Sequence, residues 1–341
     1  MNTLVFGGSV FVGRHLADLL VAEGHQVAVL NRGQTASSFG SDVERLVADR
    51  TDSDQLRAVL AGREWDAVFD VSGFVMAAGG GDIDGLLDLL DGHVGRYVYV
   101  SSIMAYDQSL AGVFPWTEDL GTNPSGPTSY GGFKAAAESR MMARNASTGF
   151  PATVARPAAI YGPDNNIFDM ETPMFLRMLQ GRPILVPHGG LVVGSYGHVD
   201  DLCTAMLMMA THPAAPGEVF NITTDGVDVN RYIATLAGVV DAEPNVVMVP
   251  DDLVDTSPVP VYGHLFQARH HAMLSPNKAI SMLGIRPRFG LLHGHRQTYE
   301  WFRARGWHEL SGPLVDPVWR ASWDFDAEAE VAGRIRGGVG V

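Results

Sequence analysis

The sequence predicts an α/β protein with a doubly wound parallel sheet and a smaller C-terminal domain. Two observations indicate the sheet: apolar runs alternate with amphipathic helical segments over the first 165 residues, and these runs lack the polar alternation of strands with one solvent-facing side. A third observation indicates the second domain, because the chain beyond residue 165 is less regular and richer in proline.

The first strand is expected over residues 2–6, where a short apolar run ends at two glycines. Apolar residues at helical spacing follow it, and Gly24 is expected to end that helix. The later strands are expected over residues 26–30, 44–48, 66–71, 96–102 and 151–157, and the helices between them over 53–62, 81–91 and 128–147. Further along the chain we expect a strand over 217–223, a loop over 250–260 and helices over 275–284 and 293–306.

Composition limits the classes of protein to which the chain can belong. Its 341 residues are 46% hydrophobic and 18% charged, as in ordinary soluble globular proteins. A net charge of −14, from 24 basic and 38 acidic residues, argues against nucleic acid as a partner. The single cysteine, Cys203, excludes an intrachain disulfide and fits a reducing compartment. Neither a signal peptide nor a bilayer-spanning apolar run is visible, so we expect a cytoplasmic protein without a membrane partner.

A glycine-rich turn, GGSVFVG over residues 7–13, follows the first strand. A strand, a tight turn and a helix N-terminus form an anion site, because free N–H groups and the helix dipole face the ligand. Gly7 permits the turn, Gly8 allows close approach of the backbone, and Gly13 lets the helix pack on the strand. Val10 stands where a middle glycine is typical, so its φ must be negative or strained. The residues expected to contact a dinucleotide here are Gly7, Ser9, Phe11, Val12 and Gly13.

A tyrosine and a lysine, Tyr130 and Lys134 in SYGGFK, are four residues apart and therefore share one face of a helix. An ammonium beside a phenol favours the phenolate, so the pair can exchange a proton near neutral pH. Ser102, at the end of an expected strand, is placed to hydrogen-bond the same substrate oxygen. Glycines at 131 and 132 weaken the helix, which indicates that something approaches that face closely. Together the three polar side chains indicate a catalytic set.

The chain resembles the extended short-chain dehydrogenase/reductase family, the NAD(P)-dependent epimerase/dehydratase group, in the order and spacing of GGSVFVG, VSSIMAY, YGGFK, RPAAIYGP and HVDDLCTAM. The resemblance covers residues 3–305 and implies a Rossmann-type sheet that binds a dinucleotide. It implies that Ser102 polarises a carbonyl or hydroxyl, that Tyr130 is the acid/base, and that Lys134 binds the nicotinamide ribose and lowers the phenol pKa. It also implies two residues that line the nicotinamide, Pro157 and Ile160.

The change in pattern near residue 165 predicts how the chain is divided. Residues 1–165 are expected to form the dinucleotide-binding domain, with residues 198–223 returning to it. The substrate-binding domain is expected over 166–197 and 224–341. Members of the family often pair through two long helices, here over 81–91 and 127–147, so a homodimer is implied as well.

The end of the second strand decides which dinucleotide is expected. An acidic residue there would bind the adenosine 2′-hydroxyl, but the chain has Asn31 and Arg32. A guanidinium matches a 2′-phosphate, so NADP is the expected cofactor; NAD is the alternative if Asn-Arg-Gly serves only as a turn. The resemblance implies three further contacts with the cofactor. Asp49 is expected near the adenine amine, Arg50 is expected to add positive charge beside it, and Ser72 is expected on the ribose side.

The reaction class follows from the residues beside Ser102, because these would supply any second acid or base. Related 4,6-dehydratases carry an Asp-Glu pair at the positions of Ile103 and Met104, so elimination of water is not expected. The sequence therefore indicates NADP-dependent reduction of a ketone of a sugar nucleotide or similar small metabolite, or alternatively NAD-dependent 4-epimerisation of a nucleotide sugar. The histidines lack the spacing of a metal site. The residues expected at the substrate are Ser102 and Met104, with Arg182 and Arg269 at its diphosphate.

A contrasting hypothesis is a non-catalytic NADPH-binding or RNA-binding regulatory protein. Relatives with an altered glycine turn and Asn-Arg-Gly after the second strand include plastid RNA-binding proteins. The retained Ser102, Tyr130 and Lys134, together with the charge of −14, argue against that hypothesis.

Overall fold

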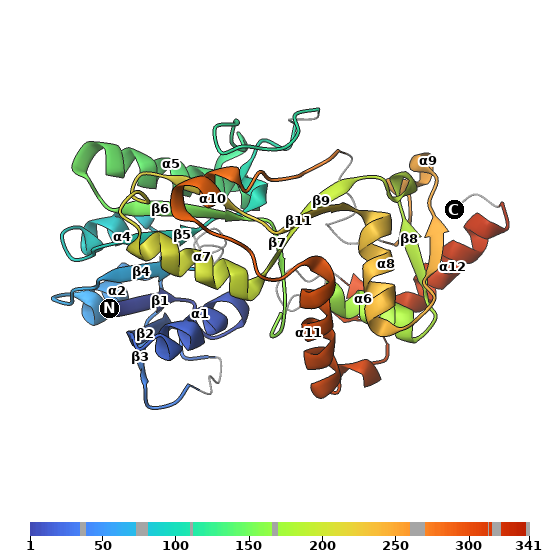
Figure 1. The fold of residues 1–341 in the computed structure, drawn as a ribbon, viewed down its shortest axis with the longest axis horizontal. Helices are drawn as coiled ribbons and strands as arrows, with labels where there is room; N and C mark the ends of the chain where they lie inside the picture. The colour runs from blue at the N-terminus through green and yellow to red at the C-terminus, as the bar shows by residue number, and fades with distance from the viewer. Residues whose placement is uncertain are drawn as a thin grey trace.

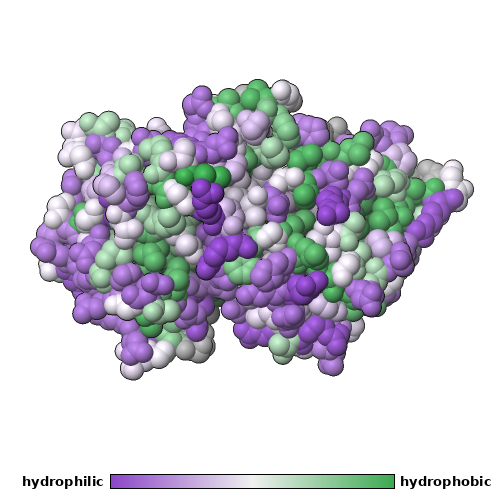
Figure 2. All heavy atoms as spheres, viewed as in Figure 1, coloured by the Kyte–Doolittle hydropathy of each residue, from purple (hydrophilic) through white to green (hydrophobic). Residues whose placement is uncertain are grey.

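Two lobes lie side by side along the long axis of the molecule (Figure 1). The computed structural model describes residues 1–34, 39–72, 81–109, 112–165, 170–259, 270–312, 314–315 and 322–338. The first lobe holds the N-terminus and the large sheet, and the second lobe holds the last helix. Figure 2 shows hydrophilic residues over both lobes on this face, with apolar residues in separate patches and a notch in the outline where the lobes meet.

The central sheet has seven parallel strands in the order β10-β6-β5-β4-β1-β2-β3. The chain runs outward from β1 in both directions, so the strand order reverses beside β1, where open α/β sheets bind their ligands. This confirms the predicted doubly wound parallel sheet, with strand ends within two residues of those expected. The strands are β1 (Asn2–Phe6), β2 (Gln26–Asn31), β3 (Val43–Val47), β4 (Ala67–Asp70), β5 (Tyr97–Val100), β6 (Ala152–Pro157) and β10 (Val219–Ile222).

Helices cover both faces of this sheet. On one face, Val5 of β1 and Val98 of β5 pack in the core that α1 and α7 share. On the other face, Leu4 and Tyr97 pack in the core of α2, α4 and α5. Because successive side chains of a strand point to opposite faces, both sets must be apolar, which explains the missing polar alternation. The helices are α1 (Phe11–Ala22), α2 (Ser53–Leu60), α4 (Ile83–Leu90), α5 (Tyr130–Thr148) and α7 (Val199–Thr211).

The second lobe is built around small sheets. One has three strands in the order β11-β9-β7 and another pairs β12 with β8. Helices α6, α8 and α11 share one apolar core with β8 and β9. The elements are β7 (Ala159–Tyr161), α6 (Glu171–Leu179), β8 (Pro183–Val186), β9 (Val193–His198), β11 (Asp225–Asp228), α8 (Val229–Val240), β12 (Asn245–Met248), α9 (Asp251–Val254), α10 (Asn277–Leu283), α11 (Leu291–Ala304), β13 (Leu314–Val315), β14 (Ser322–Trp323) and α12 (Phe325–Arg336).

The sequence reading of this lobe was incomplete. A loop was expected over 250–260, but Asp251–Val254 forms a short helix that begins after Pro250. The last helix, α12, was not predicted. Its Val331 and Ala332 pack against β8 and β12. Its Glu328 also accepts from Arg177 of α6 at 2.8 and 2.7 Å, with both side chains buried. A buried bidentate pair between residues 151 positions apart fixes α12 against α6.

The two helices expected to pair in a dimer carry ion pairs within the chain. Arg140 of α5 binds Asp84 of α4 at 2.7 Å, and Arg144 binds Asp88 and Asp91 at 2.5 and 2.9 Å. These pairs hold α4 and α5 together on the surface of the first lobe. The homodimer stays a prediction.

Among the described residues, no helix is both long enough and apolar enough to span a membrane.

Candidate active site

Three glycines of the turn are each required by a close neighbour. A Cβ on Gly7, whose φ is +87°, would lie 2.5 Å from the Cβ of Ser72. One on Gly8 would lie 2.8 Å from both methyl carbons of Val29, and one on Gly13 only 2.3 Å from the carbonyl oxygen of Gly7. Real Cβ atoms do not come this close to other heavy atoms. The backbone of the turn therefore lies directly against Val29 of β2, against Ser72 beyond the end of β4 and against the first turn of α1.

Val10, which stands where a middle glycine is typical, causes no backbone strain at its own position. Val10 has φ −140° and ψ 154°, which is extended backbone, so the predicted negative φ is confirmed. The positive φ falls instead on Phe11, at +39°, whose ring is buried in the core. A positive φ at a bulky residue is uncommon and marks a strained turn.

The turn and the end of β2 fit a dinucleotide. No side chain caps the N-terminus of α1, which leaves its first N–H groups available for an anion. Asn31 donates to the hydroxyl of Ser9 at 2.8 Å and accepts from the backbone N–H of Gly33 at 2.8 Å, which orders the segment that follows β2. Arg32 is exposed beside Asp49, whose pKa is lowered by hydrogen bonds from Thr51 and, to a lesser extent, by the charge of Arg32.

One expected cofactor contact needs correction. Arg50 was expected to add positive charge near the adenine, but its guanidinium is buried and binds both carboxylate oxygens of Asp70, at 2.6 and 2.7 Å. It also donates to the hydroxyl of Ser72, the residue that lies against Gly7. The charge of Arg50 is therefore balanced inside the protein by Asp70. The sequence does not reveal this pair, because the two residues are 20 positions apart.

The three residues of the predicted catalytic set meet at the carboxyl edge of the sheet. Tyr130 is the first residue of α5 and forms a hydrogen bond with Ser102, which follows β5. Ser102 also accepts from the backbone N–H of Met104 at 3.1 Å, which fixes its hydroxyl. Lys134 donates to the carbonyl oxygen of Val100 at 2.6 Å, and its Nζ lies 5.6 Å from the ring centroid of Tyr130.

The protonation of this set differs from the expectation. Burial raises the pKa of Tyr130 to about 12, and the hydrogen bond with Ser102 offsets only part of that rise. Lys134 was expected to lower the phenol pKa, but burial of the lysine lowers its own pKa to about 8. In this environment the phenol is held neutral at physiological pH, which is the form that can donate a proton.

The two glycines after Tyr130 are explained by close backbone contacts. A Cβ on Gly131 would lie 2.0 Å from the carbonyl oxygen of Met104, and one on Gly132 would lie 2.1 Å from that of Gly126. The expected close approach is therefore made by the chain itself. It brings the start of α5 against the segment that carries Ser102.

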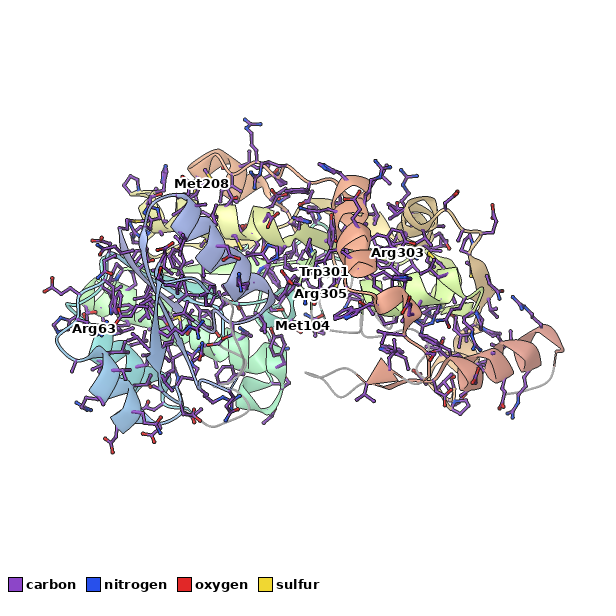
Figure 3. All side chains as sticks on the ribbon, turned by 90° about the horizontal axis from the view of Figure 1, so that it is seen from below. Arg63, Met104, Met208, Trp301, Arg303 and Arg305 are labelled. Atoms are coloured by element: carbon purple, nitrogen blue, oxygen red, sulfur yellow. The ribbon has the colours of Figure 1, made fainter. Side chains whose placement is uncertain are left out.

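The other predicted residues occupy different positions. Pro157 ends β6 and is buried, while Ile160 of β7 packs against the α1 side of the sheet core. Met104 is exposed and lies at the junction of the lobes in Figure 3, opposite Trp301 and Arg305. Their contacts with cofactor or substrate remain predictions.

Arg182 was expected at the diphosphate of the substrate, but the structure places it elsewhere. Its guanidinium forms an ion pair with Asp326 in the first turn of α12. Helix α12 lies at the end of the second lobe that is farthest from α5 (Figure 1). Arg182 is thus neutralised away from Tyr130. Arg269 lies outside the described residues.

A histidine that the sequence analysis missed lies between α1, α7 and the segment after β7. His15 of α1 contacts Asp200 of α7 through Nδ1 at 2.6 Å and the carbonyl oxygen of Pro163 through Nε2 at 3.0 Å. Its Nε2 also lies 3.7 Å from Asp164. Both ring nitrogens face oxygen acceptors, so this geometry suits the doubly protonated imidazolium. The aspartates of HVDD were the available sequence signal for a partner of His15. Asp200 is 185 positions from His15, so the sequence does not show that the two side chains meet.

Asp164 extends this contact to the second lobe. It accepts from the indole of Trp301 at 3.2 Å and from Arg305 at 3.0 Å, both on or just after α11. Figure 3 shows these two side chains on the side of α11 that faces the first lobe. The first helix of the chain and one of its last helices are therefore connected through one carboxylate.

We expect the His15 contact to make stability pH-dependent. Burial lowers the pKa of His15, but Asp164 and Asp200 outweigh it and raise the pKa to about 9. Since this lies above the unfolded value of about 6.5, the contribution is fully present below pH 6.5 and is lost as pH rises through 9. Replacing His15 with Gln should therefore cost about 2 kcal/mol at pH 6.5 and much less at pH 9.5.

Urea unfolding of both proteins at the two pH values measures this difference. The exposed His93→Gln variant is the matched control and should unfold like the wild type at each pH. An equal loss of stability for His15→Gln at pH 6.5 and pH 9.5 would contradict the expected charge of His15.

Among the described side chains, no group of three or more histidine, cysteine or acidic residues could hold a metal ion. A doubly wound sheet, a glycine turn at its switch point and a Ser-Tyr-Lys set at its carboxyl edge define an NAD(P)-dependent enzyme of the short-chain dehydrogenase/reductase type. A sequence model of the NAD dependent epimerase/dehydratase family matches residues 3–223, which include all of these elements. The chain belongs to that family.

Known proteins resemble the chain over most of its length. It is 30% identical over 324 residues to chloroplast stem-loop binding protein of 41 kDa b from Arabidopsis thaliana, covering 89% of this chain and 79% of the relative. It is 26% identical over 331 residues to ceramide reductase from Caulobacter vibrioides, covering 89% and 95%. The structure of UDP-glucose 4-epimerase with UDP-glucose from Thermotoga maritima matches with a TM-score of 0.74 and 25% identity, covering 89% and 99%. The similarity therefore extends through both lobes.

Proposed function

We propose that the protein reduces the ketone of a sugar nucleotide or similar small metabolite, with NADPH as the reductant. The observation that carries this proposal is the neutral phenol of Tyr130, hydrogen-bonded to Ser102 and placed beside the ammonium of Lys134. Ile103 and Met104 follow Ser102 and offer neither an acid nor a base for removing water. The set is suited to one proton transfer at one oxygen.

Each residue then has a defined task. A nicotinamide dinucleotide held by the glycine turn and the N-terminus of α1 would supply the hydride for the carbonyl carbon. Tyr130 donates its phenolic proton to the carbonyl oxygen, and Ser102 holds that oxygen by a hydrogen bond while charge develops on it. Lys134 keeps a positive charge 5.6 Å from the phenol ring, which stabilises the phenolate left behind.

The preference for NADPH rests on the end of β2. Arg32 is exposed there, and Asn31 orders the turn that carries it. A carboxylate at this end of the strand would repel a 2′-phosphate, whereas a guanidinium binds one. NAD-dependent 4-epimerisation is the alternative, supported by the likeness to UDP-glucose 4-epimerases from Thermotoga maritima and from Mycolicibacterium smegmatis, the latter 27% identical over 334 residues.

The substrate class is drawn from the relatives. A structural relative is solved with UDP-glucose, and other relatives are named for reduction of a ceramide and of a quinoline ketone. Arg182 is paired with Asp326, so its position does not support the proposal that it binds the diphosphate of a nucleotide sugar. Arg269 remains the predicted cation. The RNA-binding alternative is supported by the name of the plant relative, a stem-loop binding protein, and is weakened by the assembled Ser102–Tyr130 contact.

The test begins with the nucleotide that copurifies with the protein, identified by mass after denaturation, and continues with titration of NADPH and NADH. We expect NADPH to bind more tightly, and Arg32→Ala to weaken NADPH about tenfold or more while leaving NADH nearly unchanged. The exposed Arg57→Ala variant on α2 is the control and should change neither affinity. Tightly retained NAD(H) would favour the epimerase, and equal affinities would overturn the reading of Arg32.

A further inference from the structure

The helix that carries Tyr130 and Lys134 has a third polar side chain on the same face. Glu138 follows Lys134 by four residues, so the three side chains lie one above the other along α5. Lys134 and Glu138 are only 2% and 3% exposed. Glu138 has no task in the proposed reaction, yet its carboxylate is buried on the face of α5 that carries the catalytic residues. A carboxylate buried in this way needs a partner that compensates its charge.

The partner of Glu138 is Arg156 of β6. Nε of Arg156 donates to both carboxylate oxygens of Glu138, at 3.1 and 3.0 Å, and Nη2 donates to one of them at 2.6 Å. Arg156 is itself buried, and two further contacts hold it. Its Nη1 donates to the carbonyl oxygen of Glu118 at 3.4 Å, and its guanidinium lies 4.5 Å from the ring centroid of Tyr106. A forked contact between two charged groups fixes orientation as well as distance.

Strand β6 connects this ion pair with the rest of the candidate active site. Arg156 follows Ala155, which pairs with Val100 of β5, two residues before Ser102. Helix α5 packs against β6 (Figure 1). The ion pair between Arg156 and Glu138 therefore ties α5 to the strand beside the one that leads to Ser102, about two helical turns from Tyr130.

The first turn of α5 offers little to fix the rotation of the helix. Tyr130 is its first residue, and the next two residues are glycines without side chains. The N-cap residue, Ser129, accepts from the backbone N–H of Gly132 at 3.1 Å, which is a contact within the turn. Close backbone contacts bring this turn near Ser102, but the rotation of α5 about its own axis is set by side chains farther along the helix. Glu138 is the side chain on the catalytic face that binds a side chain of the sheet.

We propose that Glu138 and Arg156 are positioning residues, whose buried ion pair sets the rotation and height of α5 on the sheet. Through the helix, the pair fixes where Tyr130 and Lys134 stand relative to Ser102. The consequence for catalysis rests on the proposed function, because proton transfer from Tyr130 needs the phenol within hydrogen-bond distance of the substrate oxygen. The placement of α5 is a property of the chain alone and can be measured without a substrate.

The sequence provides a probe of this placement, because Lys134 and Lys278 are the only lysines among the 341 residues. Nζ of Lys134 lies 4.9 Å from the ring centroid of Tyr99, which belongs to β5, so the ring current of Tyr99 makes the NMR signals of this lysine sensitive to the position of α5 on the sheet. Protein labelled with ¹³C-lysine gives two Cε signals, and a Lys278→Arg variant assigns them. Lys278 faces the ring of Phe220 at 5.2 Å, in the core on the other face of the sheet, and is the internal reference.

A double variant, Glu138→Leu with Arg156→Met, replaces both charges with apolar side chains. Such a replacement of a buried ion pair often keeps the stability of a protein, but apolar packing specifies orientation less sharply. We therefore expect the variant to unfold in urea at the same concentration as the wild type or a higher one. Its Lys134 signals should move from their wild-type position while the Lys278 signals stay. Its turnover should fall by about 10- to 100-fold.

An exposed ion pair on the same helix is the matched control. Arg140 of α5 lies 2.7 Å from Asp84 of α4, and both side chains are more than half exposed. Arg140→Gln with Asp84→Asn should leave the Lys134 signals and the turnover unchanged, because exposed pairs contribute little.

A single variant, Arg156→Lys, covers the case in which the double variant does not fold. It keeps the positive charge but loses the fork of the guanidinium, so it should also displace the Lys134 signals. Lys134 signals at the wild-type position in the folded double variant, or in Arg156→Lys if the double variant does not fold, would overturn the proposal.

Turnover separates this inference from the proposed function. If the Lys134 signals move as expected and the wild type reduces no ketone, the proposed function fails and the positioning role stands. If the wild type reduces a ketone and the folded double variant keeps both its turnover and its Lys134 signals, the positioning role fails and the proposed function stands.

Discussion

Replacing Tyr130 with Phe is expected to lower turnover by about 10²- to 10⁴-fold while nucleotide affinity changes less than threefold. The change deletes the hydroxyl that forms the hydrogen bond with Ser102 and would donate the proton. It keeps the ring, whose face lies 5.6 Å from the ammonium of Lys134, so the packing at the start of α5 is preserved. Steady-state kinetics and NADPH titration measure the two effects separately.

Tyr106→Phe is the matched control for this prediction. Its hydroxyl donates to Asn221 at 2.7 Å inside a different buried cluster, four residues after Ser102. We expect that variant to keep turnover within a few-fold of the wild type, with a loss of stability of about 1 kcal/mol for the missing hydrogen bond. A Tyr130→Phe enzyme that keeps half of its turnover would show that Tyr130 is not the acid.

Replacing Gly13 with Ala is expected to weaken nucleotide binding by about 10- to 100-fold and to destabilise the first lobe by about 1–3 kcal/mol. The added Cβ would lie 2.3 Å from the carbonyl oxygen of Gly7 and 2.8 Å from the Cα of Gly8. Both are backbone atoms, so no side chain can rotate away. The turn must move off α1, which separates the N–H groups of the helix from the anion they would bind.

Titration with NADPH and urea unfolding check this prediction. Val10→Ala lies in the same turn and is the control, because Val10 is 43% exposed with extended backbone that alanine also adopts. Its affinity should stay within twofold of the wild type. A Gly13→Ala protein that binds NADPH as tightly as Val10→Ala would contradict the view that the turn contacts the nucleotide.

The central sheet and the meeting of Ser102, Tyr130 and Lys134 could be predicted because their signals are local. Apolar runs such as LVF and YVYV are buried on both faces, and the sequence carries no other explanation for them. Ser102, Tyr130 and Lys134 each stand at a strand end or on one helix face, positions that spacing alone defines. Parallel strands then bring their carboxyl ends to one edge.

The missed features depend on partners far apart in the chain. Arg50 looked free because Asp70, 20 residues later, becomes its neighbour only when β3 and β4 take their places in the sheet. Arg182 looked free because Asp326 is 144 residues away. The neutral phenol could not be predicted either, since the sequence suggested a nearby ammonium but not the burial that outweighs it.

The position of β10 has a consequence for how the protein is made. This edge strand and α7, which covers the face of the sheet beside α1, lie after the first excursion of the chain into the second lobe. A ribosome that has released residues 1–165 has therefore delivered six of the seven strands and α1, but not α7, which shares the core around Val5 and Val98 with α1. The nascent first lobe therefore carries a partly uncovered apolar face until α7, which ends at Thr211, has emerged, and during that interval it is a natural client for chaperones that bind apolar surface.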